Sequence, residues 1–500
     1  MTDNKVTVLI NGSPTLVERG ILLSEAISAE KPCGGHGKCG KCRVIAHGEL
    51  SPLTDIEASL LTDRDVDQGV RLACLTKVMG DCRVENDSTR NMQILSSGSV
   101  GDFTLDPTFK KYGVAIDIGT TTIAAKLFDT NGHTLAERCA QNPQIIYGAD
   151  VISRIEAALS GSAADLANTV RTAINTILTD LSVAVGITSV DIDGVVITGN
   201  SVMLHLLTLR SVEPLSHAPF KTEHIFGEYL TASSLGINAL LPATAVYLPP
   251  CISAFVGADI VCALLCVPKN SGCSLLVDVG TNGEMALIKN GKISVCSTAA
   301  GPAFEGVGIS MGMRGEVGAI DKVSVINGSL IPHVIGNGDA IGICGSGLVD
   351  TAACLLQLKE LDESGYLEDS IRIGNTSVYL NQTDIRSLQL AKSAICAGIE
   401  ALLHHRGLTS SDLDSFFVAG GFGNYLNMKN AQSIGLFPRG LTDRATIIGN
   451  AALSGASMIL LDRSLSDSCQ YLSGTAELLE LSTDSFFADK YMLGMLFEEK

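Results

Sequence analysis

Positive charge is scarce in this sequence. Its 500 residues include 35 Lys and Arg against 53 Asp and Glu, which gives a formal net charge of −18. A chain that follows a phosphate backbone or binds an anionic lipid surface needs an excess of the opposite sign. The charge therefore argues against nucleic acid as a partner.

A signal for export is also lacking. Residues 1–8 carry neither the basic start nor the apolar run of a signal peptide, so we expect a cytoplasmic location. The uncharged stretch from Ala239 to Ala258 has the length of a membrane span, but it contains Pro242, Pro249 and Pro250. A spanning helix would lose backbone hydrogen bonds at these prolines. We therefore expect buried core and no membrane insertion.

A disulfide framework is not expected either. Fifteen cysteines is an odd number, and without a secretory context they should be reduced thiols, some of which bind metal. Cys262 and Cys266 stand one helical turn apart in an apolar segment and are expected to be buried thiols. What the chain does have is apolar residues, at 46%, and enough length for about three domains.

The N-terminal segment predicts a small sheet followed by a metal-binding loop. Residues 5–18 alternate around Asn11-Gly12, which is a strong hairpin signal, and a short helix fits Ile21 to Ala29. Four cysteines then follow in a C-x5-C-x2-C…C pattern, which is one residue longer in its first gap than that of plant-type [2Fe–2S] ferredoxins. The predicted cluster ligands are Cys33, Cys39, Cys42 and Cys74.

Glycines between these cysteines suit a loop that wraps closely round a cluster. A zinc loop is the alternative, but it would need two paired C-x2-C units, and the segment has one. His36 is expected to be a loop residue because four thiolates already suffice, and Cys82 lies in an alternating strand where it should pack. Residues 3–86 resemble the β-grasp [2Fe–2S] ferredoxins, in the branch similar to adrenodoxin, and this resemblance implies electron transfer.

An internal repeat begins after a polar segment, residues 87–111, that has the composition of a linker. The sequence Gly-Val-Ala-Ile-Asp-Ile-Gly-Thr-Thr-Thr ending at Thr122 returns as Leu-Leu-Val-Asp-Val-Gly-Thr-Asn-Gly-Glu ending at Glu284. Each copy reads as a strand, a Gly-Thr turn, a second strand, an Asn-Gly turn and a third strand. The duplication predicts two lobes, 112–272 and 273–500.

The chemistry suited to such turns is phosphate binding. Glycine lets the backbone approach the ligand, and successive N–H groups and Thr hydroxyls donate to anionic oxygen. An aspartate just before each turn can hold Mg²⁺ and orient an attacking water. The predicted catalytic residues are Asp117, Asp278 and Glu284, and the predicted nucleotide-binding residues of the turns are Gly119, Thr120, Thr121, Thr122, Gly280, Thr281, Asn282 and Gly283.

Two further segments accompany the turns. A strand runs into a helix at Asn200, and a second strand ends in a glycine-rich turn against which an adenosine can lie. That turn contains the candidate residues Gly420, Gly421, Gly423 and Asn424. A small-residue helix over 449–456 suits close packing between lobes. Glu305 and Arg314 lie in glycine-rich loops after the second turn and are further candidates.

Residues 112–460 resemble the ASKHA superfamily of acetate kinase, sugar kinases, heat-shock cognate proteins and actin. The resemblance implies that 117–122 and 278–284 are the two phosphate segments, 420–424 the adenosine segment, and 197–203 and 449–456 the connecting helices. The expected fold is thus an α+β, β-grasp [2Fe–2S] ferredoxin domain, residues 1–86, followed by a duplicated, two-lobed α/β ATPase of the actin-like, ribonuclease H-like class.

The whole chain resembles the reductive activators of corrinoid proteins, which use ATP to return a Co(II) corrinoid of a methyltransferase system to Co(I). Segments 300–306, 312–320 and 342–350 match as well. The resemblance implies a [2Fe–2S] cluster, ATP and Mg²⁺, with a corrinoid protein and an electron donor as partners. Some members carry a larger insert where this chain has only residues 87–111, so a homodimer is left open.

Two other functions fit parts of the pattern. One is an ASKHA small-molecule kinase with a vestigial iron–sulfur domain, or a dehydratase-activator-type ATPase with an electron-transfer domain. The other is a chaperone-like ATPase, for which the segment after Ala456 is too short to hold a polypeptide-binding domain. The fusion of a ferredoxin to this ATPase favours the activator.

Overall fold

The structure is a computed structural model that describes residues 5–10, 13–27, 37, 42–61, 65–66, 68–85, 103–222, 224–269, 271–421 and 426–497. The chain divides into two compact units, one of residues 1–91 with 143–169 and one of residues 92–142 with 170–500. The smaller unit contains the cysteine segment. The larger unit contains both copies of the internal repeat.

The smaller unit contains a five-stranded sheet in the order β2-β1-β5-β3-β4. Its elements are β1 (Lys5–Ile10), β2 (Ser13–Glu18), β3 (Arg43–Leu50), β4 (Val70–Leu72) and β5 (Val78–Glu85), with helices α1 (Leu23–Ala26) and α2 (Asp55–Leu60). β1 pairs antiparallel with β2, as the hairpin prediction requires, although Asn11 and Gly12 lie outside the described residues. Alternate side chains such as Val8, Val44 and Val84 form its core, and Cys82 is buried among them as predicted.

The first lobe of the larger unit is built on a six-stranded sheet in the order β10-β11-β9-β6-β7-β8. Its strands are β6 (Tyr112–Ile118), β7 (Thr122–Asp129), β8 (Thr134–Gln141), β9 (Ile192–Gly199), β10 (Glu228–Thr231) and β11 (Ala245–Leu248). The same stretch of chain contains helices α4 (Val151–Ala157), α5 (Ala163–Val185), α6 (Ser201–Thr208) and α7 (Ala258–Leu265), of which α4 and the start of α5 fall in the smaller unit. β6 to β8 are the predicted three-stranded repeat.

The second lobe repeats this plan in the order β21-β20-β12-β13-β14-β22. Its strands are β12 (Ser274–Val279), β13 (Asn282–Lys289), β14 (Lys292–Ala299), β20 (Ser415–Ala419), β21 (Ala445–Gly449) and β22 (Glu477–Leu478). In both lobes the first strand of the meander also pairs parallel with a later strand, β6 with β9 and β12 with β20. The predicted duplication is therefore present in the topology.

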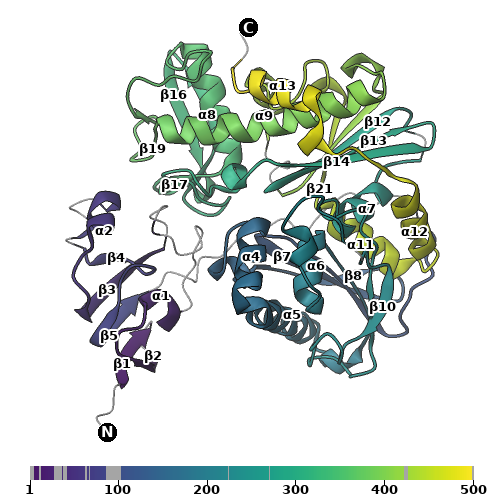
Figure 1. Cartoon of the computed structure of the whole chain (residues 1–500), viewed down its shortest axis with the longest axis horizontal. Coiled ribbons are helices and arrows are strands. Elements are labelled where there is room, and N and C mark those ends of the chain that lie inside the picture. Colours follow the sequence, from purple (N-terminus) through teal and green to yellow (C-terminus); the bar gives the residue numbers. More distant parts are fainter. Residues whose placement is uncertain are drawn as a thin grey trace. The chain divides into compact units, whose positions relative to one another are not determined.

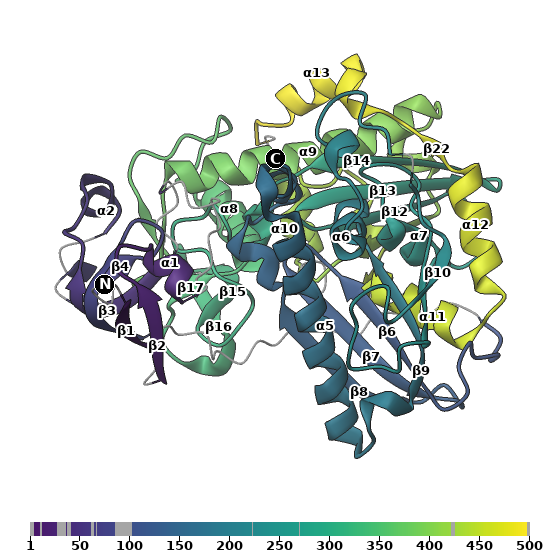
Figure 2. The same ribbon diagram turned by 60° about the horizontal axis from the view of Figure 1, so that its bottom comes forward.

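Helices and a small sheet complete the second lobe. The helices are α8 (Gly345–Leu358), α9 (Gln382–His405), α10 (Met428–Ser433), α11 (Ala451–Leu461), α12 (Leu465–Thr475) and α13 (Ser485–Leu493). The long helix α9 packs on β13 and β14, as the two views show (Figures 1 and 2). β15 (Ala319–Ile326), β16 (Ser329–Val334) and β17 (Gly342–Ile343) form the small sheet, on which α8 packs, and β18 (Ile371–Arg372) pairs with β19 (Tyr379–Leu380).

Close contact between α11 and α7 explains the small residues of the predicted packing helix. A side chain at Gly455 would place its Cβ 2.0 Å from the carbonyl oxygen of Cys262, so glycine is needed there. α11 also packs on β6 and β9 of the first lobe. Cys262 and Cys266 are buried, as the sequence predicts.

Residues 103–111 behave differently from the linker that their composition predicts. The backbone N–H groups of Asp106 and Thr108 donate to the carbonyls of Leu461 and Leu460 at the end of α11, at 2.8 and 2.9 Å. Phe109 is buried, and it fills the space beside the glycines at 113 and 194. Phe109, the partly buried Phe103 and the carbonyls at the end of α11 thus hold a segment that polar composition alone assigns to a linker.

The uncharged stretch 239–258 is largely buried core, including β11, Cys251 and Val256. Over the part of the chain that the structure describes, no helix combines the length and apolar character needed to cross a membrane.

Candidate functional site

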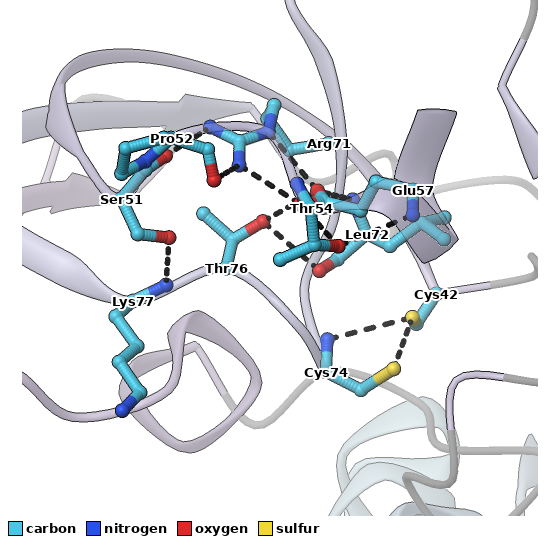
Figure 3. A network of polar contacts seen from close by, with 10 residues as sticks. All are labelled: Cys42, Ser51, Pro52, Thr54, Glu57, Arg71, Leu72, Cys74, Thr76 and Lys77. Carbon is cyan, nitrogen blue, oxygen red and sulfur yellow. Dashed lines mark hydrogen bonds and ion pairs between the residues drawn. The ribbon is translucent and has the colours of Figure 1, made fainter. Parts of the chain in front are cut away.

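The cysteine site begins with two thiols from distant parts of the smaller unit. Cys42 and Cys74 are buried, and their sulfur atoms lie 3.2 Å apart (Figure 3). Cys42 directly precedes β3, and Cys74 follows shortly after β4. The two cysteines come together because Arg43 at the start of β3 pairs with Leu72 at the end of β4. Two thiolates at this separation fit ligation of one metal centre, which is the chemistry of an iron–sulfur site.

The other two predicted ligands, Cys33 and Cys39, lie outside the described residues, as does His36. Within the described ranges no cluster of three or more His, Cys, Asp or Glu side chains is arranged to hold a metal ion. The full four-cysteine ligand set therefore stays a prediction, and the Cys42–Cys74 pair is the part of it that the geometry supports.

A buried carboxylate that sequence reasoning missed lies beside this pair. Glu57 of α2 is fully buried and accepts hydrogen bonds from the Arg71 guanidinium, the Leu72 N–H and the Thr76 hydroxyl, at 2.9 to 3.1 Å (Figure 3). Burial acts to raise the pKa of Glu57, but Arg71 and the other donors together hold that pKa below its ordinary value. One side chain thus fastens both ends of segment 71–76, which carries Cys74.

The Thr54-x-x-Glu57 spacing is a capping box, and the structure contains it. That signal locates the start of α2, but it does not show that the same carboxylate reaches Arg71 and Thr76. Those contacts depend on the fold of the sheet.

Replacing Glu57 with glutamine should loosen the Cys74 segment. The change leaves the Arg71 guanidinium without its charged partner. Breaking a buried ion pair in this way costs about 3 kcal/mol. We expect the visible absorbance of anaerobically prepared full-length protein to be lost at a lower temperature than in the wild type. Glu25→Gln, at an exposed position of α1, is the matched control. Equal temperatures for Glu57→Gln and wild type would contradict this assignment.

The second site is a cavity of about 280 Å³ in the larger unit, at the ends of the paired strands. Most of the predicted nucleotide-site residues line it. They are Asp117, Gly119, Thr120, Thr121, Thr122, Asn200, Asp278, Gly280, Thr281, Asn282, Glu284, Gly420 and Gly421, joined by Glu305 and Arg314. The structure therefore brings together turns that lie far apart in the sequence.

Among the described residues, one predicted position, Gly283, is not part of this lining. Gly283 faces Ile395 and Thr298, and a Cβ there would lie 2.2 Å from Ile395, so this glycine serves packing. Gly423 and Asn424 lie outside the described residues. Gly420 has a φ of +96°, and a Cβ there would lie 2.6 Å from the Val279 carbonyl, so the turn needs glycine to pass this close to the second phosphate turn.

The two aspartates occupy equivalent positions near the ends of β6 and β12. Asp117 accepts a hydrogen bond of 2.9 Å from the Asn450 side chain, which caps α11. Asn200 caps α6 and donates to the Thr120 hydroxyl at 3.2 Å. Asn450 was missed because an Asn before a helix looks like an ordinary cap. The hydrogen bond from Asn450 to Asp117 joins residues that are 333 positions apart in the sequence.

Neither aspartate has the environment of an ordinary surface carboxylate. Burial raises the pKa of Asp117 to about 7, with a further contribution from the charge of Asp259 and an opposing one from the Asn450 hydrogen bond. Burial also raises the pKa of Asp278 to about 7, and the charges of Asp259, Asp117 and Glu305 add to this. Both carboxylates need a counter-charge to ionise fully.

A second acidic pair lies behind them. Asp259, in the first turn of α7, and Glu284 are hydrogen-bonded to each other, and Glu284 also accepts from the Gly257 N–H at 3.2 Å. Burial raises the pKa of Asp259 to about 6, and burial together with the charge of Asp259 raises the pKa of Glu284 well above its ordinary value. Burial and the repulsion between the two carboxylates thus both favour the protonated form of this pair. Asp259 was missed because a lone acid at a helix start reads as a surface residue.

The donor set fits Mg²⁺ with a phosphate ligand. Carboxylate oxygens are the ligands that this ion prefers, and hydroxyl and N–H donors of the turns suit phosphate oxygens. Arg314 is the sole Lys or Arg among the described residues that line the cavity. A divalent cation would supply the counter-charge that Asp117 and Asp278 lack.

Comparison with known protein families covers almost the whole chain. Residues 4–79 match the 2Fe-2S iron-sulfur cluster binding domain, residues 112–268 the RACo middle region, and residues 272–500 the C-terminal domain of RACo, described as the ASKHA domain. The fold predicted from the sequence, a ferredoxin domain followed by an ASKHA domain, is thereby confirmed.

Relatives extend the likeness to whole proteins. The corrinoid activation enzyme RamQ of Eubacterium limosum is 36% identical over 81% of this chain and 74% of its own length. The [Co(II) methylated amine-specific corrinoid protein] reductase of Methanosarcina barkeri is 26% identical over 76% of each chain. A solved reductive activator for corrinoid, iron-sulfur protein superposes with a TM-score of 0.73 at 27% identity, covering 98% of both chains.

Proposed function

This chain belongs to the family of corrinoid activation enzymes, and from that premise we propose that it reductively activates a corrinoid protein of a methyltransferase system. The reaction is transfer of one electron, from a [2Fe–2S] cluster held by the N-terminal domain, to Co(II), which becomes Co(I). ATP hydrolysis in the cavity of the larger unit drives it. The observation that carries this proposal is that one chain contains both a buried thiol pair and a cavity lined by two copies of a predicted phosphate-binding turn.

The domains divide the work in this proposal. Residues 1–86 hold the cluster through Cys33, Cys39, Cys42 and Cys74, and residues 87–111 connect this domain to the two lobes, 112–272 and 273–500. The [2Fe–2S] group supplies one-electron redox chemistry when bound. The protein's contribution is to bury two of the thiols and to fix the Cys74 segment through Glu57.

Electron transfer from the cluster to the corrinoid is energetically unfavourable in this proposal. Plant-type clusters have reduction potentials of about −400 mV, and we take the corrinoid acceptor to be harder to reduce. For one electron, a gap of ~59 mV corresponds to ~1.4 kcal/mol, so a gap of ~120 mV needs about 2.8 kcal/mol. Nucleotide binding that favours one conformation of the lobes over another can supply a few kcal/mol.

The cavity residues have separate tasks in ATP hydrolysis. Asp117 and Asp278 would hold Mg²⁺ directly or through water, and this ion would neutralise charge on the phosphates. Thr120, Thr121 and Thr281 donate to phosphate oxygens. Asp278 would orient the attacking water, because Glu284 is only 5% exposed and is already hydrogen-bonded to Asp259.

The adenosine is assigned to the glycine turn after β20. Gly420 and Gly421 line the cavity, and neither has a side chain to cover its backbone. Gly423 and Asn424 continue this segment. Asn200 also lines the cavity, and its hydrogen bond to Thr120 fixes the first phosphate turn.

A pH effect follows from the raised pKa of Asp278. Its folded pKa of about 7 lies above the value near 3.9 of an unfolded chain, so the metal-free protein loses stability as pH rises between these values. Asp278→Asn removes this loss. In EDTA we expect the variant to exceed the wild type in thermal midpoint at pH 8, and by less at pH 5; the two advantages should differ by ~2–3 kcal/mol in free energy of unfolding.

Differential scanning fluorimetry at the two pH values measures this effect. Asp180→Asn, an exposed acid on α5, should show no pH-dependent difference from the wild type. The same offset for Asp278→Asn at both pH values would show that Asp278 ionises as an ordinary surface acid.

Steady-state ATP hydrolysis, measured with and without a Co(II) corrinoid protein, tests the proposed function. We expect Mg²⁺-dependent ADP release that the corrinoid protein stimulates. ADP release that instead depends on a small hydroxyl or carboxylate acceptor would identify a kinase. An optical spectrum and iron content of the anaerobic protein test the cluster separately.

A further inference from the structure

One carboxylate occupies the donors of both phosphate turns. Glu305 accepts hydrogen bonds from the Thr281 N–H at 3.1 Å and from the Thr281 hydroxyl at 2.9 Å, both through Oε1. Its other oxygen, Oε2, accepts from the Thr121 hydroxyl. Thr121 belongs to the turn after β6 in the first lobe, and Thr281 to the turn after β12 in the second. A single side chain therefore joins the two lobes inside the cavity.

These are the donors that the proposed function assigns to phosphate. A carboxylate and a phosphate both present anionic oxygens to N–H and O–H donors. Only one anion can accept from the same Thr281 N–H in good geometry. Two anions side by side also repel each other, and this part of the cavity already contains Asp117 and Asp278.

We propose that Glu305 is an internal competitor for nucleotide phosphate: its carboxylate takes the donors of both turns, and the outermost phosphate of a nucleotide must displace it. The proposal rests on the proposed function, because it assumes that the cavity binds ATP. It makes Glu305 a residue that sets affinity for polyphosphate. When phosphate binds, its contacts with both turns would replace the link that Glu305 makes between the lobes.

The surrounding backbone allows the side chain to leave without opening the loop. The Gly301 N–H donates to the Thr281 carbonyl at 3.0 Å, and the Ser310 N–H donates to Asp384 at 2.6 Å, so the loop is held on both sides of Glu305. Phe304, next in the chain, is buried. Displacement of Glu305 is therefore a rotation of its side chain.

Binding of adenylyl imidodiphosphate to the full-length protein tests this. In EDTA we expect Glu305→Gln to bind it about tenfold more tightly than the wild type, since a neutral amide competes weakly and does not repel phosphate. AMP, which lacks the outer phosphates, should bind with unchanged affinity. Glu305→Asp keeps the charge, but its side chain is too short to span both turns, so it should also bind the analogue more tightly.

Glu316→Gln is the matched control, because it removes the same charge from another part of the cavity wall. Equal tightening by Glu316→Gln would show a general charge effect and overturn the proposal. So would weaker binding of the analogue by Glu305→Gln in Mg²⁺, because that result identifies Glu305 as a metal ligand. Wild-type protein that binds no nucleotide rejects the proposed function itself, whereas nucleotide binding that Glu305→Gln leaves unchanged rejects only the competitor.

Discussion

Replacing Cys42 with serine should lower the rate of Co(I) formation more than 100-fold while leaving nucleotide affinity within about twofold of wild type. Cys42 lies 3.2 Å from Cys74 in a buried position where the geometry supports joint ligation. A serine oxygen is a hard and weakly bound replacement for a thiolate at an iron–sulfur site. The described residues that line the cavity proposed for nucleotide all belong to the larger unit.

The measurement pairs iron content and visible absorbance with Co(I) formation and nucleotide binding. Cys82→Ser is the control, since Cys82 is equally buried in β5 but is predicted to pack and not to ligate. It should keep its iron and its electron transfer. A Cys42→Ser protein that retains full activity without iron would instead support a small-molecule kinase with a vestigial N-terminal domain.

Replacing Asp117 with asparagine should reduce ATP hydrolysis by about 10²–10³-fold. The variant has nearly the same shape, but it removes the carboxylate whose pKa burial raises to about 7 and which the account assigns to Mg²⁺. Without hydrolysis, Co(I) formation should fall to the level seen in the absence of ATP. The visible spectrum of the cluster should not change.

Asp180→Asn, on the exposed face of α5 in the same lobe, controls for loss of a carboxylate. It should hydrolyse ATP at the wild-type rate. Hydrolysis by Asp117→Asn within about threefold of wild type would remove Asp117 from the catalytic residues and would leave Asp278 as the sole candidate of the aspartate pair.

Local repetition explains why much of the cavity could be predicted from sequence. Asp117 and Asp278 stand in two copies of one strand-turn-strand unit, and the pairing of Asp278 with Glu284 across β12 and β13 follows from the length of the turn. Positions such as these depend on neighbours a few residues away. Their chemistry is visible in the motif itself.

Contacts that depend on tertiary packing were not predictable in this way. Asn450 reaches Asp117, and Glu305 reaches Thr121, because whole lobes meet. Asp259 becomes part of the site only because the first turn of α7 lies beside Glu284. Gly283 shows the opposite error, since a glycine inside the motif serves contact with α9 and not the ligand.

The most direct test of the account is to mix the reduced protein anaerobically with a Co(II) corrinoid protein and to follow cobalt by its optical spectrum, with and without ATP. We predict that Co(I) accumulates to a substantial yield only when ATP is present. Equal Co(I) yields in the two samples would contradict the central claim that the nucleotide cavity drives the electron to the corrinoid.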